Sequence, residues 1–322
     1  PGPQANPAGR YMREMNRLGL VGFASQIWQQ YGDLSQFRFG PTQAHLVVRP
    51  EHVERILVEH SENYIKGSSY DKLRMWLGRG LLTSEGTDWR EQRELMAPSF
   101  SKKNVNHYGE IMTAVACEVR QRWQSFSGQE VNLNAEMMRL TTSIISRSFF
   151  TEDIVDATSK VDLALQTILS QSIQRMTALI DPPLFIPTPA NQAYLRALNV
   201  LDNFLYDIIE QRREKQEGND LLWHLIEVYD AERGEQGGYL NHRRLRDEVL
   251  VIFFAGYETT TQWLTWTWLL LSQHPEVEAR LHDELAQTLK GYSPFTQDVP
   301  RLPYTRMVLN EVLRLYPPVA LF

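Results

Sequence analysis

The sequence contains few of the residues from which several kinds of site are built. It has one cysteine, Cys117, among 322 residues, which excludes an intrachain disulfide and a zinc site made of several cysteines. It has no long run of lysine or arginine and a formal net charge of −6, so nothing in it indicates nucleic-acid binding. The first ten residues, PGPQANPAGR, lack the apolar stretch of a signal peptide. We therefore expect a cytoplasmic protein, or a membrane-peripheral one if an N-terminal anchor was removed.

One apolar run, over residues 250–272, is long enough to cross a membrane. Glu258 stands at its centre, where a carboxylate costs about 2.5–3.5 kcal/mol on insertion scales, and five threonines and a glutamine dilute the run further. We interpret the run as the buried central helix of a globular protein, with a transmembrane helix as the alternative.

Most of the remaining chain shows helical spacing of apolar residues. Such patterns cover 89–97, 103–126, 134–150, 157–179, 191–216, 219–232, 242–273, 275–290 and 304–315, and a further one begins at Pro50. LSQFRFG and HLVVRP predict a short hairpin with its turn at Gly40 and Pro41. The prediction is a mainly α protein with a small β-sheet near the N-terminus.

The long central helix carries an unusual insertion, VIFFAGYETTTQWL, in which a glycine, a glutamate and three threonines interrupt an apolar run. Glycine costs about 1 kcal/mol inside a helix, and threonine is a mediocre helix former. Asn241 is the expected N-cap, and Asp247 and Glu248 are expected near the positive end of the helix.

Ala255 and Thr259 share a face of this helix because they are four residues apart. Together with Gly256 they offer a small surface against which something flat can lie, and Glu258 is a nearby proton carrier. A threonine hydroxyl that bonds the carbonyl four residues earlier can also bend a helix. The string alone favours the alternative, a kinked core helix that has a buried polar patch.

Four stretches resemble, in the correct order, those of the cytochrome P450 family of haem-thiolate monooxygenases. They are GLLTSEGTDWREQRELMAPSFS (80–101), AGYETT (255–260), HPEVEARLHDEL (274–285) and EVLRLYPP (311–318). The resemblance covers nearly the whole chain and implies a single cytochrome P450 domain over 1–322. It also implies that the cofactor is haem b.

By this resemblance, Trp89 and Arg93 bind the haem propionates, and Ala255 and Gly256 lie against the haem. Thr259 is implied to hydrogen-bond iron-bound dioxygen, and Glu258 to help deliver protons. The alternative for Trp89 and Arg93 is one turn of an ordinary amphipathic helix with surface charges.

Glu311 and Arg314 match the Glu-x-x-Arg pair of the family, which is buried and structural there. The alternative is an exposed ion pair, worth little. The family's iron ligand is a cysteine in a loop well after this pair, and the sequence ends at Phe322. Cys117 lies in the helical pattern EIMTAVACEVRQRW and is expected to be a core residue. We therefore expect a C-terminally truncated chain that has no axial ligand and is inactive alone.

The resemblance also places a substrate pocket. The positions that match it are Leu82, Phe254, Val319, Ala320 and Leu321. All are apolar, which suits a hydrophobic, lipid-like substrate such as a fatty acid or a terpenoid. No reductase domain follows, so the electrons that reduce O₂ would come from NAD(P)H through a separate ferredoxin or reductase. The alternative function is a non-catalytic helical protein of this fold that binds no haem and acts through partners.

Overall fold

The structure is a computed structural model, and it describes residues 2, 10–39, 42–150, 155–177, 181–215, 220–231 and 238–321. These residues are mainly helical with one two-stranded sheet, which confirms the predicted fold class. The contacts divide the chain into two compact units: the first is Pro1–Leu73, Leu169–Gln192 and Leu321–Phe322, and the second is Arg74–Ile168 and Ala193–Ala320. We describe each unit by itself. The prediction of a single domain over 1–322 stays a prediction.

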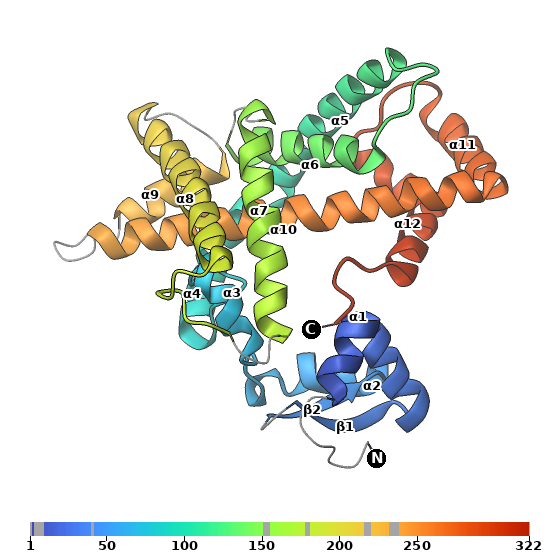
Figure 1. The fold of residues 1–322 in the computed structure, drawn as a ribbon. Helices are drawn as coiled ribbons and strands as arrows, with labels where there is room; N and C mark the ends of the chain where they lie inside the picture. Colours follow the sequence, from blue (N-terminus) through green and yellow to red (C-terminus); the bar gives the residue numbers. More distant parts are fainter. Residues whose placement is uncertain are drawn as a thin grey trace. The chain divides into compact units, whose positions relative to one another are not determined.

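The elements follow the chain in Figure 1. The α-helices are α1 (Arg10–Tyr31), α2 (Pro50–Glu54), α3 (Ser69–Leu77), α4 (Gly86–Met96), α5 (Lys102–Gln124), α6 (Leu133–Phe149), α7 (Val155–Thr177), α8 (Pro189–Lys215), α9 (Leu221–Ala231), α10 (Gly238–Gln273), α11 (Pro275–Leu289) and α12 (Pro303–Leu315). Short helical turns of other types are Arg55–Glu59, Ser61–Asn63, Ala97–Phe100 and Thr296–Arg301. The strands are β1 (Leu34–Phe39) and β2 (Thr42–Val47).

The first unit is built around α1 and the hairpin. β1 and β2 are antiparallel, with Leu34 opposite Val47 at one end of the register. The ring of Phe23 on α1 meets the ring of Phe37 on β1 edge-on, with centroids 5.7 Å apart, within a small apolar cluster. The predicted hairpin is confirmed, and its predicted turn at 40–41 lies outside the described residues.

The second unit is organised by α10, which runs through it in Figure 1 with α9 near its first half and α11 and α12 near its last. The buried side chains of α10 include the apolar residues Leu250, Phe253 and Tyr257. This burial explains how the helix tolerates poor helix formers, because packing and not local propensity supplies most of the stability of a helix in a protein.

Helix α6 packs along one side of α10. Its contact surface is rich in hydroxyl groups, and the Oγ1 atoms of Thr141 and Thr261 lie 2.6 Å apart. Thr261 also donates to the carbonyl of Tyr257 at 2.8 Å. A Cβ on Gly256 would lie 3.1 Å from the Cδ1 atom of Ile145, which is tighter than ordinary contact. Small residues thus let the two helices come close here.

The sequence pattern predicts the helices of the second unit well and those near the N-terminus less well. Each of the patterns from 89 to 315 falls on an observed helix, with ends that differ by a few residues. Helices α1 and α3 were not predicted. Gly19 interrupts α1 with φ 72° and ψ 169°, so its two halves do not share one helical period. Helix α10 begins at Gly238, so the predicted N-cap at Asn241 is wrong.

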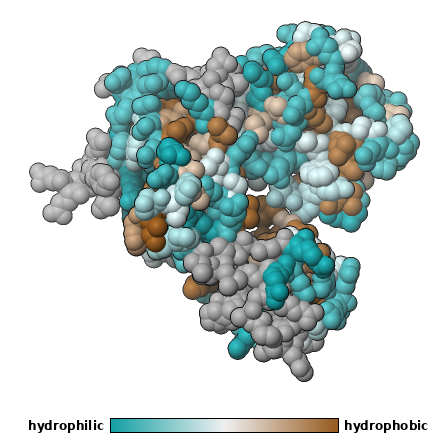
Figure 2. Space-filling model, viewed as in Figure 1, coloured by the Kyte–Doolittle hydropathy of each residue, from teal (hydrophilic) through white to brown (hydrophobic). Residues whose placement is uncertain are grey.

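The surface in Figure 2 is mostly hydrophilic, with apolar side chains in scattered patches. Among the described residues, no helix combines the length and the apolar character needed to cross a bilayer. The alternative of a transmembrane helix at 250–272 therefore finds no support there.

A buried ion pair joins α8 to the start of α9. Arg212 and Asp220 are each 8% exposed and in contact, and Asp220 also accepts the backbone N–H of Trp223 at 2.8 Å. Removing one partner would leave a buried charge, so we predict that Asp220→Ala lowers the free energy of unfolding by about 3–5 kcal/mol. Glu118, which pairs with Arg147 at the surface, is the control: Glu118→Ala should cost less than about 1 kcal/mol. Denaturant unfolding measures both, and equal losses would contradict the burial of the first pair.

Candidate functional site on helix α10

The face of α10 that carries Ala255 and Thr259 points away from α6. Each residue of an α-helix advances about 100° around the axis, so these two side chains lie about 40° apart. The α6 contacts at Gly256 and Thr261 fall about 100° and 240° from Ala255 on the same wheel. Ala255 is exposed and Thr259 is half-buried. The structure therefore brings the predicted residues together on one open face.

The Thr259 hydroxyl donates to the carbonyl oxygen of Ala255 at 2.6 Å. Thr265 and Thr267 bond their own i−4 carbonyls in the same way, at 2.8 Å. The chain nevertheless stays α-helical from Gly238 to Gln273. The hydroxyl proton of Thr259 is directed at the helix, which leaves its oxygen as an acceptor toward the open face.

The Glu258 carboxylate is half-buried and turned along the helix. Its Oε1 atom accepts a hydrogen bond from Nε2 of Gln262 at 2.6 Å. On the helical wheel Gln262 lies between Glu258 and Thr259. Glu258 thus flanks the open face, and Gln262 holds it in place.

Helix α4 presents Trp89 and Arg93 together. The Arg93 guanidinium lies over the Trp89 ring, 5.4 Å from the centroid, and both side chains are exposed. Residues four apart share a helix face, so the guanidinium donors and the indole N–H reach the same side of α4. Such a pair is suited to bind carboxylates.

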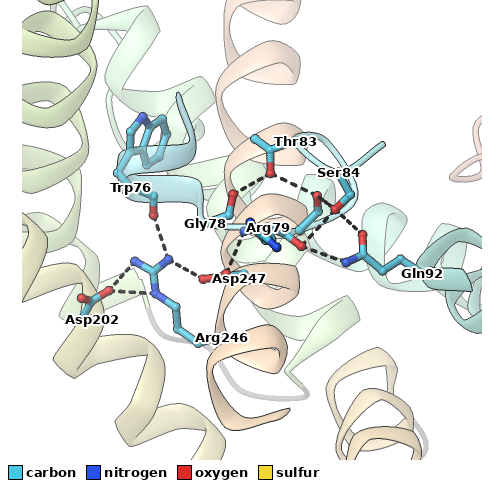
Figure 3. A network of polar contacts seen from close by, with 10 residues as sticks. Trp76, Gly78, Arg79, Thr83, Ser84, Gln92, Asp202, Arg246 and Asp247 are labelled. Atoms are coloured by element: carbon cyan, nitrogen blue, oxygen red, sulfur yellow. Dashed lines mark hydrogen bonds and ion pairs between the residues drawn. The ribbon is translucent and has the colours of Figure 1, made fainter. Parts of the chain in front are cut away.

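The residues between α3 and α4, which we call the 78–84 loop, are attached to α10 through backbone groups (Figure 3). The N–H of Arg79 donates to Oδ2 of Asp247 at 2.8 Å, and the N–H of Leu81 donates to Oε2 of Glu248 at 3.0 Å. Asp247 and Glu248 are 4% and 0% exposed. They lie about ten residues inside α10, so their predicted position at its positive end is wrong.

Glycines allow the loop to come this close to α10. Gly78 has φ +67°, and a Cβ there would lie 1.9 Å from Oδ2 of Asp247. A Cβ on Gly80 would lie 2.7 Å from Cγ2 of Val251 and 2.8 Å from the carbonyl oxygen of Asp247. Any larger residue at either position would push the loop away from the helix.

Arg246 extends the network to α8, as Figure 3 shows. Its guanidinium donates to Asp202 at 2.8 Å, to the carbonyl of Trp76 at 2.8 Å and to Oδ1 of Asp247 at 2.9 Å. On the far side of the loop, Nε2 of Gln92 on α4 donates to the carbonyl of Arg79 at 2.8 Å. The loop is therefore bonded directly to α10 and α4, and α8 reaches this network through Arg246.

Burial shifts the ionisation of both α10 carboxyl groups. It raises the pKa of Glu248 to about 7; the neighbouring charge of Asp247 adds to this rise, and the N–H of Leu81 opposes it. Burial also raises the pKa of Asp247, against the N–H of Arg79 and the charge of Arg246. A buried carboxyl group without a cation on each oxygen favours its neutral form.

The predicted substrate residues are distributed over several segments. Leu82 is exposed on the 78–84 loop, and Phe254 on α10 is half-buried, with its ring edge-on to Trp76 at 4.9 Å. Val319 and Ala320 are exposed in the segment after α12. Leu321 belongs to the first unit, so the structure does not relate it to the others.

Glu311 and Arg314 form the predicted pair, but it is not buried among the described residues. Two hydrogen bonds join them, at 2.8 and 2.7 Å, and the side chains are 55% and 67% exposed. The hydrogen bond and charge of Arg314 lower the pKa of Glu311. The geometry of the pair is as predicted, and its burial is not observed.

Cys117 does not stand among metal ligands. It is half-buried on α5, with its Sγ atom 3.3 Å from the Ser293 hydroxyl. Across the described part of the chain, no cluster of three or more His, Cys, Asp or Glu side chains could hold a metal ion. The structure thus keeps Cys117 as a packing residue with one polar contact.

Sequence reasoning missed the attachment of the 78–84 loop to α10. Two signals were available: GRGLL places two glycines around a single residue, and Glu248 lies seven residues before Ala255 on the same face of α10. Neither signal identifies the segment that it contacts, because the contact joins segments about 170 residues apart.

The comparisons with known proteins identify the family of the chain. The sequence profile of the family described as Cytochrome P450 matches residues 1–322. The chain is 33% identical to pentalenene oxygenase of Streptomyces avermitilis, over 99% of this chain and 70% of that protein. It is 33% identical to cyclooctatin synthase and 35% identical to cyclooctat-9-en-7-ol 5-monooxygenase, both of Streptomyces melanosporofaciens, over 91% and 93% of this chain.

The last two matches cover 63% and 66% of the relatives, so the chain spans about two thirds of the length of these proteins. The match of the family profile extends over the whole chain. This chain belongs to the cytochrome P450 family.

Proposed function

We propose that the protein to which this chain belongs is a haem monooxygenase that hydroxylates a hydrophobic, lipid-like substrate. In the overall reaction, R–H, O₂, two electrons and two protons give R–OH and water. The observation that carries the proposal is the open face of α10, where the Thr259 hydroxyl is fixed 2.6 Å from the Ala255 carbonyl. Three relatives named for oxygenation or for the synthesis of cyclooctatin support the class of reaction.

The residues present fit a haem. Arg93 and Trp89 offer charged and neutral donors on one side of α4, which suits propionate groups. The small side chain of Ala255 leaves the α10 backbone accessible to a flat ring. Bound haem supplies the iron at which O₂ is reduced. We assign no axial ligand to the described residues.

The residues of α10 supply proton handling beside that ring. The Thr259 oxygen is held in place by its bond to Ala255 and can accept or pass a proton on the open face. Glu258, kept in position by Gln262, is the nearest carboxylate on that side of the helix. Positioned proton donors of this kind contribute about 10²–10⁴ to a rate.

The apolar side chains of Leu82 and Phe254 support a hydrophobic substrate, such as a terpene. Val319 and Ala320 remain proposed members of the same pocket, and Leu321, which belongs to the first unit, stays a prediction from the sequence. O₂ is the second substrate, and a separate ferredoxin or reductase is the proposed source of electrons from NAD(P)H. Cytoplasmic localisation stays a prediction from the sequence.

Loss of the Thr259 hydroxyl should uncouple electron use from oxygenation. We predict that Thr259→Ala keeps haem and substrate binding, while product per reducing equivalent falls about tenfold and hydrogen peroxide rises. Thr265→Ala is the matched control, because Thr265 makes the same bond to its i−4 carbonyl on another side of α10. Equal coupling in Thr259→Ala and the parent would argue decisively against the proposed role.

The Glu311–Arg314 pair is proposed to support the fold of the whole protein, as it does in the family. We predict that Glu311→Ala gives little folded, haem-loaded protein. Glu118→Ala, which breaks a similar exposed two-bond pair with Arg147, should express like the parent. If Glu311→Ala expressed and melted like the parent, the pair would be an ordinary surface bridge.

A further inference from the structure

We infer that Glu248 is a positioning residue for the substrate. Its carboxyl group docks the 78–84 loop, and with it Leu82, over the same face of α10 that carries Ala255 and Thr259. The inference rests on the proposed function for its effect on substrate, and on the structure alone for the docking.

The face assignment follows from helix geometry. Glu248 precedes Ala255 by seven residues and Thr259 by eleven, so on the helical wheel it falls between them. At 1.5 Å per residue, it lies about 10 Å along the axis from Ala255. Whatever Glu248 holds is therefore held over the same stripe of α10, about two turns before the small residues.

Glu248 holds the loop next to the predicted substrate residue. The N–H of Leu81 donates to its Oε2 at 3.0 Å, and Leu82 is the next residue, with its Cα about 3.8 Å further along the chain. The Leu82 side chain is 38% exposed, so packing restrains it less than it restrains a core side chain. Its position depends on the backbone to which it belongs.

Internal hydrogen bonds make the 78–84 loop rigid. Thr83 is fully buried, and its hydroxyl donates to the carbonyl of Gly78 at 2.7 Å. Arg74 donates to the carbonyl of Thr83 at 2.9 Å. Because the loop is bonded within itself, the two backbone bonds to Asp247 and Glu248 fix how the whole loop lies on α10.

The Glu248 carboxyl group is unusual for a purely structural acceptor. Its Oε1 atom is buried and has no hydrogen-bond partner within the described residues. The charged groups around Asp247 and Glu248 are Arg246 and Arg243 on α10 and Asp202 on α8. Arg246 donates a hydrogen bond to Asp247 and not to Glu248. With burial holding its pKa at about 7, Glu248 changes charge in the neutral range.

The direction of the pH effect follows from that shift. The docked carboxyl group favours the proton more than a solvated one does, so docking is strongest at low pH. It is lost progressively as pH rises from the ordinary value of 4.5 through about 7. Gln at this position keeps an acceptor for the Leu81 N–H and cannot ionise.

The experiment compares Glu248→Leu and Glu248→Gln in the whole haem-loaded protein. Glu284→Gln is the matched control, because the Glu284 carboxyl group on α11 also accepts hydrogen bonds from backbone N–H groups, those of Tyr304 and Thr305. Hydrogen exchange measures protection of the 78–84 amides without substrate. Steady-state turnover of a fatty acid or terpene that the parent oxidises separates KM from kcat.

In Glu248→Leu we expect protection of the loop to fall about tenfold or more and KM to rise several-fold, with kcat within about twofold. In the parent, protection should fall between pH 4.5 and about 7 and level off above, whereas Glu248→Gln should show no such change. The control should match the parent in both readouts.

Unchanged loop protection in Glu248→Leu would overturn the docking. Reduced protection with an unchanged KM would overturn the role toward substrate. If Glu248→Leu fails to fold, the pH profiles of loop protection in the parent and in Glu248→Gln decide the question. Identical profiles would overturn the inference. Failure of the proposed function is distinguishable from all of these, because loop protection requires no turnover.

Discussion

The packing of α6 against α10 fixes the rotation of α10 about its own axis, and the candidate site depends on that rotation. Thr141 and Ile145 of α6 meet Thr261 and Gly256 across an interface of small side chains. With that side covered, Ala255 must point the opposite way. Because α10 is hydrophobic nearly all round, its sequence pattern does not determine which side stays open, and the packing against α6 does.

The same rotation places two carboxyl groups where they are costly. A buried carboxyl group without a cation is destabilising, and Glu248 is fully buried with one oxygen unpartnered in the described structure. These carboxyl groups accept hydrogen bonds from backbone N–H groups of the 78–84 loop, which attach the loop to α10. Local stability is given up where segments far apart in sequence must be held in register, which is common at functional sites.

The sequence predicted the helices of the second unit and the members of the α10 face, because periodicity and motif order are local properties. Ala255, Thr259, Trp89 and Arg93 could be named without a structure. The loop attachment could not, since the partners of Glu248 lie about 170 residues away and a carboxylate in sequence does not reveal its burial. For the same reason, the sequence pattern wrongly predicts Asp247 and Glu248 near the positive end of α10.

The most direct test of the central claim is the visible spectrum of the whole protein with Ala255→Phe. Ala255 is exposed and faces away from α6, so the larger ring should leave the fold intact, as circular dichroism would show. If this face of α10 lies against haem, the variant will bind less haem or show a displaced Soret band. A full complement of haem, with the parent's Soret band and the parent's response to substrate, would contradict the account.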